Sequence, residues 1–308
     1  MLDLIATVPG VVILHDCCLG HLLGAVEAAS GEHLTGVWSR ALAESHGYAA
    51  LQLRFFDPQK ALWRFPVSLP VIASARAVIV HSEHARSLLH DCYGAGPLSA
   101  CSVVPLARSL ARPVAQVRAR ADLGLDPQGF IVVSVGFLGQ TKLSHRVLQA
   151  WQASALGRDP RSRLLFVGEL PGDDYGRTLM QMIKCSGCGE RIQITGYVPA
   201  AQFRQYLAAA DLAVQLRTAS RGESSATVLD TMSHGLPLIV NAHGSMAELD
   251  PDSVCMLPDD FADEDLVTAL ETLAQCPELR HRLGENARKQ VATHHTPQAV
   301  ARRSHVLV

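Results

Sequence analysis

The stretch that decides the fold runs from Arg217 to Gly235 and reads RTASRGESSATVLDTMSHG. A small, polar loop enters a predicted helix, for which Ser224 and Ser225 are N-cap candidates because a serine oxygen can accept a free N–H of the first turn. Gly235 ends the helix, since glycine adopts the left-handed conformation without strain. The apolar run 238–240 then predicts a buried strand. The stretch is either an anion site, favoured by bare N–H groups and the helix dipole, or an ordinary loop–helix–strand unit.

Short apolar runs alternate with helical patterns on both sides of this stretch. Alternation of strands with helices predicts an α/β fold with doubly wound parallel sheets. The predicted strands cover residues 11–14, 77–80 and 102–106, and then 130–135, 164–168, 192–198, 212–216, 238–240 and 255–257.

The two sets of strands predict two domains. We expect a first, Rossmann-like domain over residues 1–115, a second over 116–294 and a C-terminal segment over 295–308. Three strands leave a parallel sheet with uncovered apolar faces and an open edge. We therefore expect the first domain to be incomplete, the chain to be N-terminally truncated and apolar surface to be exposed near Val11 to Leu14.

Composition excludes several classes of protein. The chain has 308 residues, of which 48% are hydrophobic, and a net charge of -2, so it is neither a disordered chain nor a basic nucleic-acid binder. It contains no apolar run long enough to span a bilayer, and its start does not resemble a signal peptide. The eight scattered cysteines predict reduced thiols. Cys185 and Cys188 form a single CxxC. A zinc site needs four ligands, and no second pair lies nearby in the sequence, so this pair does not predict a zinc site.

His15 and Asp16 follow the first predicted strand. Ligands of open α/β sheets bind beyond the carboxyl ends of the strands, so this pair is well placed for chemistry. A histidine that caps the next helix is the alternative, and the sequence leaves both open.

Six segments together carry a family resemblance through their order and spacing. They are VVILHD, ARAVIVHSEHA, VVSVGFLGQTKLSHRVLQAW, RIQITGYVPAAQFRQYLAAADLAVQL, RGESSATVLDTMSHGLPLIVNAHGSMAEL and RLGENARKQVATHHTP. Over nearly the whole chain they resemble the retaining glycosyltransferases of family 4, also called group 1, which have the GT-B fold.

The resemblance implies a retaining glycosyltransferase of polysaccharide biosynthesis. It would move a sugar from a nucleotide diphospho-sugar to a saccharide or lipid-linked saccharide, without a cofactor and without a metal. A non-catalytic nucleotide-sugar-binding remnant and a GT-B epimerase are the alternatives. We expect a cytoplasmic protein that binds no nucleic acid, and contact with the inner face of a membrane is left open.

The resemblance also implies the site residues. Lys142 matches a lysine that contacts the pyrophosphate, where a fixed ammonium stabilises developing negative charge. Asp230 matches the second acid of a paired-acid motif that binds the ribose. The first acid would fall at Gly222, and Glu223 stands one position later. The donor-binding residues implied are Gly139, Lys142, Gly196, Tyr197, Val198, Arg217, Arg221, Ser224, Ser225, Asp230, His243, Gly244 and Ser245. The catalytic candidates implied are His15, Asp16 and Glu223.

Overall fold

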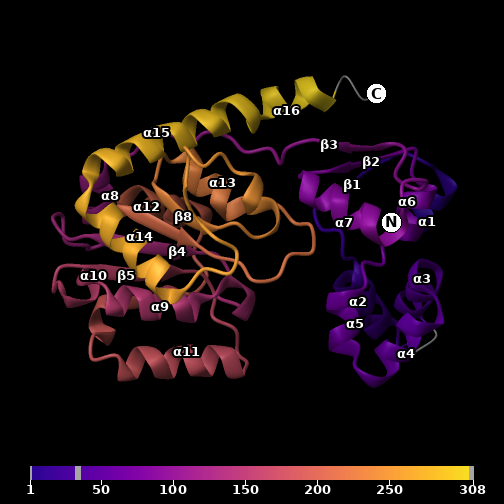
Figure 1. Ribbon diagram of the computed structural model, residues 1–308, viewed down its shortest axis with the longest axis horizontal. Helices are drawn as coiled ribbons and strands as arrows, with labels where there is room; N and C mark the ends of the chain where they lie inside the picture. The colour runs from indigo at the N-terminus through magenta and orange to yellow at the C-terminus, as the bar shows by residue number, and fades with distance from the viewer. Residues whose placement is uncertain (1, 32–35, 305–308) are drawn as a thin grey trace. The chain divides into compact units, whose positions relative to one another are not determined.

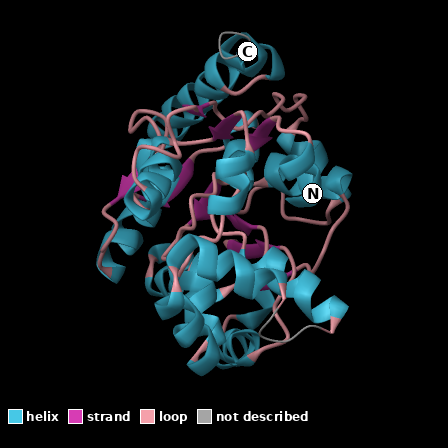
Figure 2. Ribbon diagram, turned by 90° about the vertical axis from the view of Figure 1, so that its right-hand side faces the viewer, coloured by secondary structure: helices cyan, strands magenta, loops and turns pink. Residues whose placement is uncertain are grey.

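The computed structural model describes residues 2–31 and 36–304, which belong to two compact units. The first unit comprises Met1–Leu106, Ser220–Ser224 and Arg302–Val308. The second comprises Ala107–Ala219 and Ser225–Ala301. In each unit strands are flanked by helices, so the predicted α/β class is confirmed (Figures 1 and 2).

The first unit is built on a three-stranded parallel sheet of order β1-β2-β3 (Figure 1). Its elements are α1 (Leu2–Thr7), β1 (Val11–Ile13), α2 (Gly20–Ser30), α3 (Val37–His46), α4 (Tyr48–Phe56), α5 (Pro58–Arg64), α6 (Leu69–Ser74), β2 (Ala77–Val80), α7 (Glu83–Tyr93) and β3 (Cys101–Val103). The register pairs Val12 with Val78 and Ile79 with Ser102, so the three strands end at the same edge.

Strand β1 is an edge strand with an exposed apolar face. Val11 is 48% exposed and Ile13 53% exposed, which confirms the predicted apolar surface at these two positions. Leu14, by contrast, is buried because it packs into the core that β2 shares with α7. Within the described residues the sheet has the three strands that the sequence predicted.

The second unit is built on a six-stranded parallel sheet of order β6-β5-β4-β7-β8-β9. Its elements begin with α8 (Gln116–Asp122), β4 (Ile131–Val135), η1 (Gln140–Lys142), α9 (Ser144–Ala153), α10 (Ala155–Arg158), β5 (Arg163–Val167), α11 (Asp174–Cys185), η2 (Gly189–Arg191) and β6 (Ile192–Ile194). They continue with α12 (Ala200–Ala209), β7 (Leu212–Gln215), α13 (Ala226–Ser233), β8 (Leu238–Asn241), η3 (Gly244–Glu248), β9 (Cys255–Leu257), α14 (Asp263–Gln275), α15 (Pro277–His294) and α16 (Pro297–Ser304).

The helices of the second unit pack on one another as well as on the sheet. Helices α9, α10, α11 and α14 pack together, and α8 packs on α12 while α13 packs on α15. Strands β4 and β7 are buried along their whole length, and β5 from its second residue onward, as in parallel sheets covered on both faces. Trp151 and Phe166, both buried, anchor the core between the sheet and α9.

The helix predicted in the opening stretch is present as α13. Ser225 is its N-cap residue and Gly235, with φ of 69°, has the predicted left-handed conformation. The predicted side-chain capping hydrogen bond is not formed at this N-cap. The Ser225 hydroxyl accepts instead from the Arg217 guanidinium at 3.2 Å.

Two segments group differently from the predicted domain limits. Residues 107–115, predicted with the first domain, belong to the second unit. The Arg108 N–H donates to the His295 carbonyl, and Arg288 donates to the Ala111 carbonyl at 3.0 Å. Ser220–Ser224 belongs to the first unit, where the Arg221 carbonyl accepts from the Cys17 N–H at 2.9 Å.

The segment between α4 and β2 forms two short helices, α5 and α6. Helix α5 begins with proline at its first position, and the Asp57 side chain caps it by accepting from the Lys60 N–H at 2.9 Å. This Asp-Pro pair is a helix-start signal that predicts α5.

All eight cysteines are free thiols, as predicted. Across residues 2–31 and 36–304, no helix has the length and hydrophobicity needed to cross a bilayer.

Candidate functional site

His15 and Asp16 lie directly beyond β1, at the carboxyl edge of the first unit's sheet. His15 is exposed, and its Nδ1 lies 2.8 Å from Nε2 of His81, which follows β2. The nitrogen Nδ1 of His81 lies 2.8 Å from the carbonyl oxygen of Val104, which follows β3. One residue from the end of each strand thus contributes to a single hydrogen-bonded row.

Asp16 is held by two donors. Its Oδ1 accepts from the Cys18 N–H at 2.7 Å, and its Oδ2 forms an ion pair with the Arg221 guanidinium at 3.1 Å. Burial raises the pKa of Asp16, although the Cys18 bond and the Arg221 charge oppose the rise. The guanidinium of Arg221 also lies over the Trp63 ring, 4.9 Å from its centroid. The structure therefore joins two predicted site residues, Asp16 and Arg221, that are far apart in sequence.

Glu223 is the acid of this loop because position 222 has no room for a side chain. Gly222 has φ of 85°, and a Cβ there would overlap the Cys17 sulfur and lie 3.1 Å from the Cys17 Cβ. Glu223 accepts from the Arg221 N–H at 2.7 Å and from the Ser220 hydroxyl at 3.4 Å. The Glu223 carboxylate therefore helps to fix the conformation of its own loop. Ser224 is the last residue of the segment Ser220–Ser224 that belongs to the first unit.

In the second unit, Gly139 and Lys142 lie in the loop after β4. Gly139 precedes η1, and its carbonyl accepts from the Lys142 N–H at 2.9 Å. The next residue, Leu143, has φ of 54° and is the one non-glycine residue with positive φ in the described part of the chain. The Thr218 N–H donates to the Thr141 carbonyl at 3.1 Å, which ties this loop to the one after β7.

Arg217 and Ser225 belong to a hydrogen-bonded network at the same edge. The Asn241 side chain, at the end of β8, accepts from the Arg217 N–H and donates to its carbonyl, both at 2.8 Å. The Ser225 hydroxyl lies 3.2 Å from that of Thr227. Thr227 donates to Gln215, the last residue of β7, at 3.4 Å. The network fixes the loop that precedes α13.

His243, Gly244 and Ser245 form the turn between β8 and η3. His243 Nδ1 lies 2.7 Å from Oδ1 of Asp259, which also accepts from Asn241 at 3.3 Å. Gly244 has φ of 57° and begins η3. The turn is thus anchored to the segment after β9.

Asp230 lies on α13 and is partly buried. Its Oδ1 pairs with Arg108 Nε at 3.3 Å. Burial raises the pKa of Asp230, while the charges of Arg108 and His234 oppose the rise. The carboxylate lines a cavity of about 790 Å³, whose walls are the first half of α12, the end of α13 and residues 109–114.

Gly196, Tyr197 and Val198 follow β6, which is the edge strand opposite β9 in the sheet order. Gly196 has φ of 68°, and its carbonyl accepts from the Thr195 hydroxyl at 2.8 Å. Tyr197 is 82% exposed. These three residues therefore lie away from the network around Arg217.

The structure adds four polar residues that sequence reasoning missed. Asn241 ends β8, while Asp259 and His81 follow β9 and β2, so their positions at a carboxyl edge were readable from the sequence. Arg108 gave no local signal, because its pairing with Asp230 depends on the path of the connecting segment.

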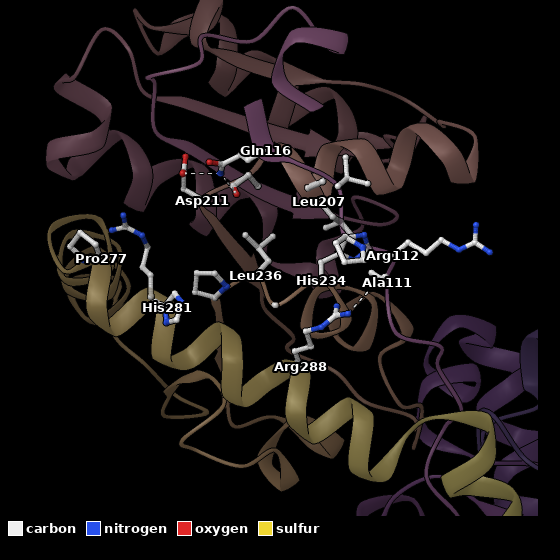
Figure 3. Close-up of a pocket in the computed structure, with 17 residues that line it drawn as sticks. Ala111, Arg112, Gln116, Leu207, Asp211, His234, Leu236, Pro277, His281 and Arg288 are labelled. Carbon is white, nitrogen blue, oxygen red and sulfur yellow. Dashed lines mark hydrogen bonds between the residues drawn. The ribbon is translucent and has the colours of Figure 1, made fainter. Parts of the chain in front are cut away.

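A second cavity of about 480 Å³ lies at the opposite edge of the same sheet (Figure 3). Asp211 and Pro237, which line it, directly precede β7 and β8. Gln116 donates to Asp211 at 3.2 Å, and Arg288 donates to the Ala111 carbonyl (Figure 3). Open α/β sheets bind ligands at their carboxyl edge, so this amino-edge cavity is not the candidate site.

Among residues 2–31 and 36–304, no three His, Cys, Asp or Glu side chains gather closely enough to hold a metal ion. The candidate residues comprise hydrogen-bond donors, cationic side chains and the carboxylates of Asp16, Glu223 and Asp230.

Comparison with known proteins identifies relatives over most of the chain. The family described as Glycosyl transferases group 1 matches residues 116–290. The D-inositol 3-phosphate glycosyltransferase of Segniliparus rotundus is 27% identical over 233 residues, 74% of this chain and 51% of the relative. The protein of the same name from Rhodococcus jostii is 30% identical over 214 residues, 67% of this chain and 46% of the relative. The chain therefore spans about half the length of the curated relatives it matches.

Among solved structures, the Anabaena protein HepE in complex with UDP is similar, with a TM-score of 0.71 and 17% identity. The match covers 99% of this chain and 73% of HepE. This likeness shows the GT-B fold.

Proposed function

Because the chain belongs to the group 1 glycosyltransferases, we propose that it transfers a sugar from a nucleotide diphospho-sugar to a saccharide or lipid-linked saccharide, with retention at the anomeric carbon. The observation that carries the proposal is the convergence of the loops after β4, β7 and β8 at one sheet edge. These loops bring a lysine and the start of α13 to the place where open α/β sheets bind ligands.

The second unit would bind and activate the donor. As the bond to the sugar breaks, negative charge develops on the leaving diphosphate. The Lys142 ammonium and the backbone N–H groups of the first turn of α13 would stabilise that charge. Arg217 holds the Ser225 hydroxyl and adds positive charge beside that helix start. These groups supply without a metal the charge that a divalent cation would otherwise provide.

Asp230 would bind the ribose. A carboxylate accepts hydrogen bonds from two neighbouring hydroxyls, and such charge-assisted bonds are stronger than neutral ones. The Asp230 side chain is 34% exposed on α13 and is therefore accessible to a ligand. Gly196, Tyr197 and Val198 would contact the base through the turn after β6.

The first unit would bind the transferred sugar or the acceptor through His15 and Asp16. Glu223 would contact the sugar from the loop 220–224. HepE, similar in fold, has been solved with UDP and with UDP-glucose. Uridine diphosphate is therefore the first donor nucleotide to test.

A thermal-shift screen with UDP, GDP, ADP and their glucose conjugates tests donor binding. A ligand at 100 times its Kd stabilises the folded state by about 2.7 kcal/mol. We expect one nucleotide to raise Tm, and Lys142→Ala to lose most of that rise. Lys184→Ala, which removes an exposed lysine on α11, is the matched control. An unchanged rise in the Lys142 variant would exclude its contact with the diphosphate.

A turnover assay separates the proposed transferase from the alternatives. With the bound nucleotide's sugar conjugate and a saccharide acceptor, the transferase forms a glycoside of unchanged anomeric configuration, which proton NMR identifies. We expect Lys142→Ala to lower kcat/KM by the equivalent of about 2–4 kcal/mol. Nucleotide binding without any product would identify a non-catalytic binder, and an epimerised sugar would identify an epimerase.

A further inference from the structure

The pair of His15 and His81 has a hydrogen-bonding pattern that fixes its protons. The two rings lie 4.8 Å apart between centroids and are tilted by 33°. Nε2 of His81 is 2.8 Å from Nδ1 of His15, and Nδ1 of His81 is 2.8 Å from the Val104 carbonyl oxygen. Each distance is that of a hydrogen bond.

The direction of each bond follows from the carbonyl. A carbonyl oxygen only accepts, so the proton of that bond resides on Nδ1 of His81. In a neutral imidazole the other nitrogen is then an acceptor. Nε2 of His81 therefore accepts, and Nδ1 of His15 carries the proton that it donates. The remaining nitrogen of His15, Nε2, is left with its lone pair.

We propose that His81 is a positioning residue, which holds His15 in the Nδ1–H tautomer and presents its Nε2 as a hydrogen-bond acceptor for a ligand hydroxyl. The inference rests on the proposed function for the identity of that ligand, a sugar or a saccharide acceptor. With both rings neutral, the tautomer itself follows from the two hydrogen bonds of His81.

The strand ends give this device its rigidity. His15, His81 and Val104 follow β1, β2 and β3, whose parallel pairing fixes their spacing. The Leu14 N–H donates to the Ile79 carbonyl at 2.9 Å, and the Val104 N–H donates to the Val80 carbonyl at 2.8 Å. The backbone on both sides of the row is therefore held, and the exposed His15 ring takes its orientation from His81.

Two substitutions at His81 separate its two bonds. In His81→Asn the shorter amide lies where Nδ1 was and can still donate to Val104, but it does not reach His15. In His81→Gln the amide lies where Nε2 was, and its oxygen can accept from His15. Asparagine removes the proposed control of His15, and glutamine retains it.

Long-range proton–nitrogen NMR of the ¹⁵N-labelled full chain reads the tautomer of each histidine ring. Signals of His15 are assigned by their loss in His15→Gln. We expect the Nδ1–H form in the native protein and in His81→Gln, and loss of that preference in His81→Asn. His21, in the same unit, is the internal control and should be unchanged in all three proteins, which also reports that the unit is folded.

Two results would overturn the assignment of the tautomer. One is a native His15 protonated at Nε2, which would mean that His81 carries two protons and donates to His15. The other is a His15 tautomer that does not respond to His81→Asn while the His21 signals remain native. Neither result depends on donor or acceptor, so the NMR experiment stands even if no transfer activity is found.

Turnover then tests what the tautomer is for. We expect His81→Asn to lower kcat roughly 3- to 10-fold, the loss that one neutral hydrogen bond accounts for, with nucleotide binding unchanged. His81→Gln should restore most of it. A His81→Asn protein that has lost the tautomer but keeps full kcat would overturn the positioning role.

Discussion

The substitution Gly222→Ala tests why the acid of the loop 220–224 lies at Glu223 rather than one residue earlier. Gly222 is buried, with φ of 85°, and faces Cys17 and Ala85. If the packing of this loop is as observed, even a methyl group at position 222 should destabilise the first unit.

The cost has two parts. An L-residue in a left-handed conformation loses about 1–2 kcal/mol relative to glycine. Overpacking adds about 1–3 kcal/mol, because the new Cβ would overlap the Cys17 sulfur and lie 3.4 Å from the Ala85 Cβ. We therefore expect Gly222→Ala to lower the free energy of unfolding by about 2–5 kcal/mol.

Gly31→Ala is the matched control, because Gly31 has φ of 72° and no atom within 4 Å of its Cβ position. Gly31→Ala should lower the free energy of unfolding by the backbone contribution alone, about 1–2 kcal/mol. The double variant Gly222→Ala, Cys17→Ala removes the obstructing sulfur, so the pair should show a favourable coupling of about 1–3 kcal/mol. Urea unfolding followed by circular dichroism and tryptophan fluorescence measures the native protein, the single variants Gly222→Ala, Cys17→Ala and Gly31→Ala, and the double variant.

A Gly222→Ala protein no less stable than Gly31→Ala would refute the packing of this loop on Cys17. So would a double variant without coupling. Either result would leave room for an acid at position 222 and would remove the reason for assigning its role to Glu223.

Four further predictions concern the site. Asp230→Asn should weaken nucleotide binding by about 1.5–3 kcal/mol, measured by titration calorimetry. Because burial raises the pKa of Asp230, the folded state binds this proton more tightly than the unfolded chain. The group's contribution to stability therefore falls as pH rises through its folded pKa, and the stability of Asp230→Asn relative to the native protein should increase as the pH rises above about 4, the pKa of an unperturbed aspartate; a pH-independent difference would contradict this. Glu223→Gln should lower kcat more than nucleotide affinity, and a large loss of nucleoside diphosphate binding would show that Glu223 and Asp230 have exchanged roles. Transfer should persist in a chelator such as EDTA, and activity that requires added Mn²⁺ or Mg²⁺ would refute a lysine and a helix terminus as the source of positive charge.

Most of the second unit's fold was readable because its signals are local. The predicted run 130–135 became β4 (Ile131–Val135), and the predicted run 238–240 lies within β8 (Leu238–Asn241). Helix α5 has a local signal as well, because Asp57 and Pro58 form a recognised helix start.

The contacts within the site were less readable than its residues. The ends of strands could be located, and with them His15 and Asp16, while Lys142 was implied by the family resemblance. The partners could not, since Asp16 meets Arg221 and Arg217 meets Asn241 only through the paths of loops. Contacts between side chains so far apart in the sequence produce no recognisable pattern in one amino-acid sequence.

Leu143 has a left-handed backbone conformation and directly follows Lys142, the residue proposed to contact the diphosphate. A non-glycine residue in the left-handed region costs on the order of 1–3 kcal/mol and persists only where its surroundings fix it. Here the Leu143 N–H donates to the Gln140 carbonyl at 3.1 Å, and the Leu143 carbonyl accepts from Arg146 and Val147. Its side chain also packs against the core cluster beside α9, a contact that glycine would lack. The strain is therefore offset by burial of the leucine, and the backbone directly after Lys142 is held in one direction. A lysine fixed in this way loses less freedom on meeting a diphosphate than one on a mobile loop, and such preorganisation is what electrostatic stabilisation of a leaving group requires.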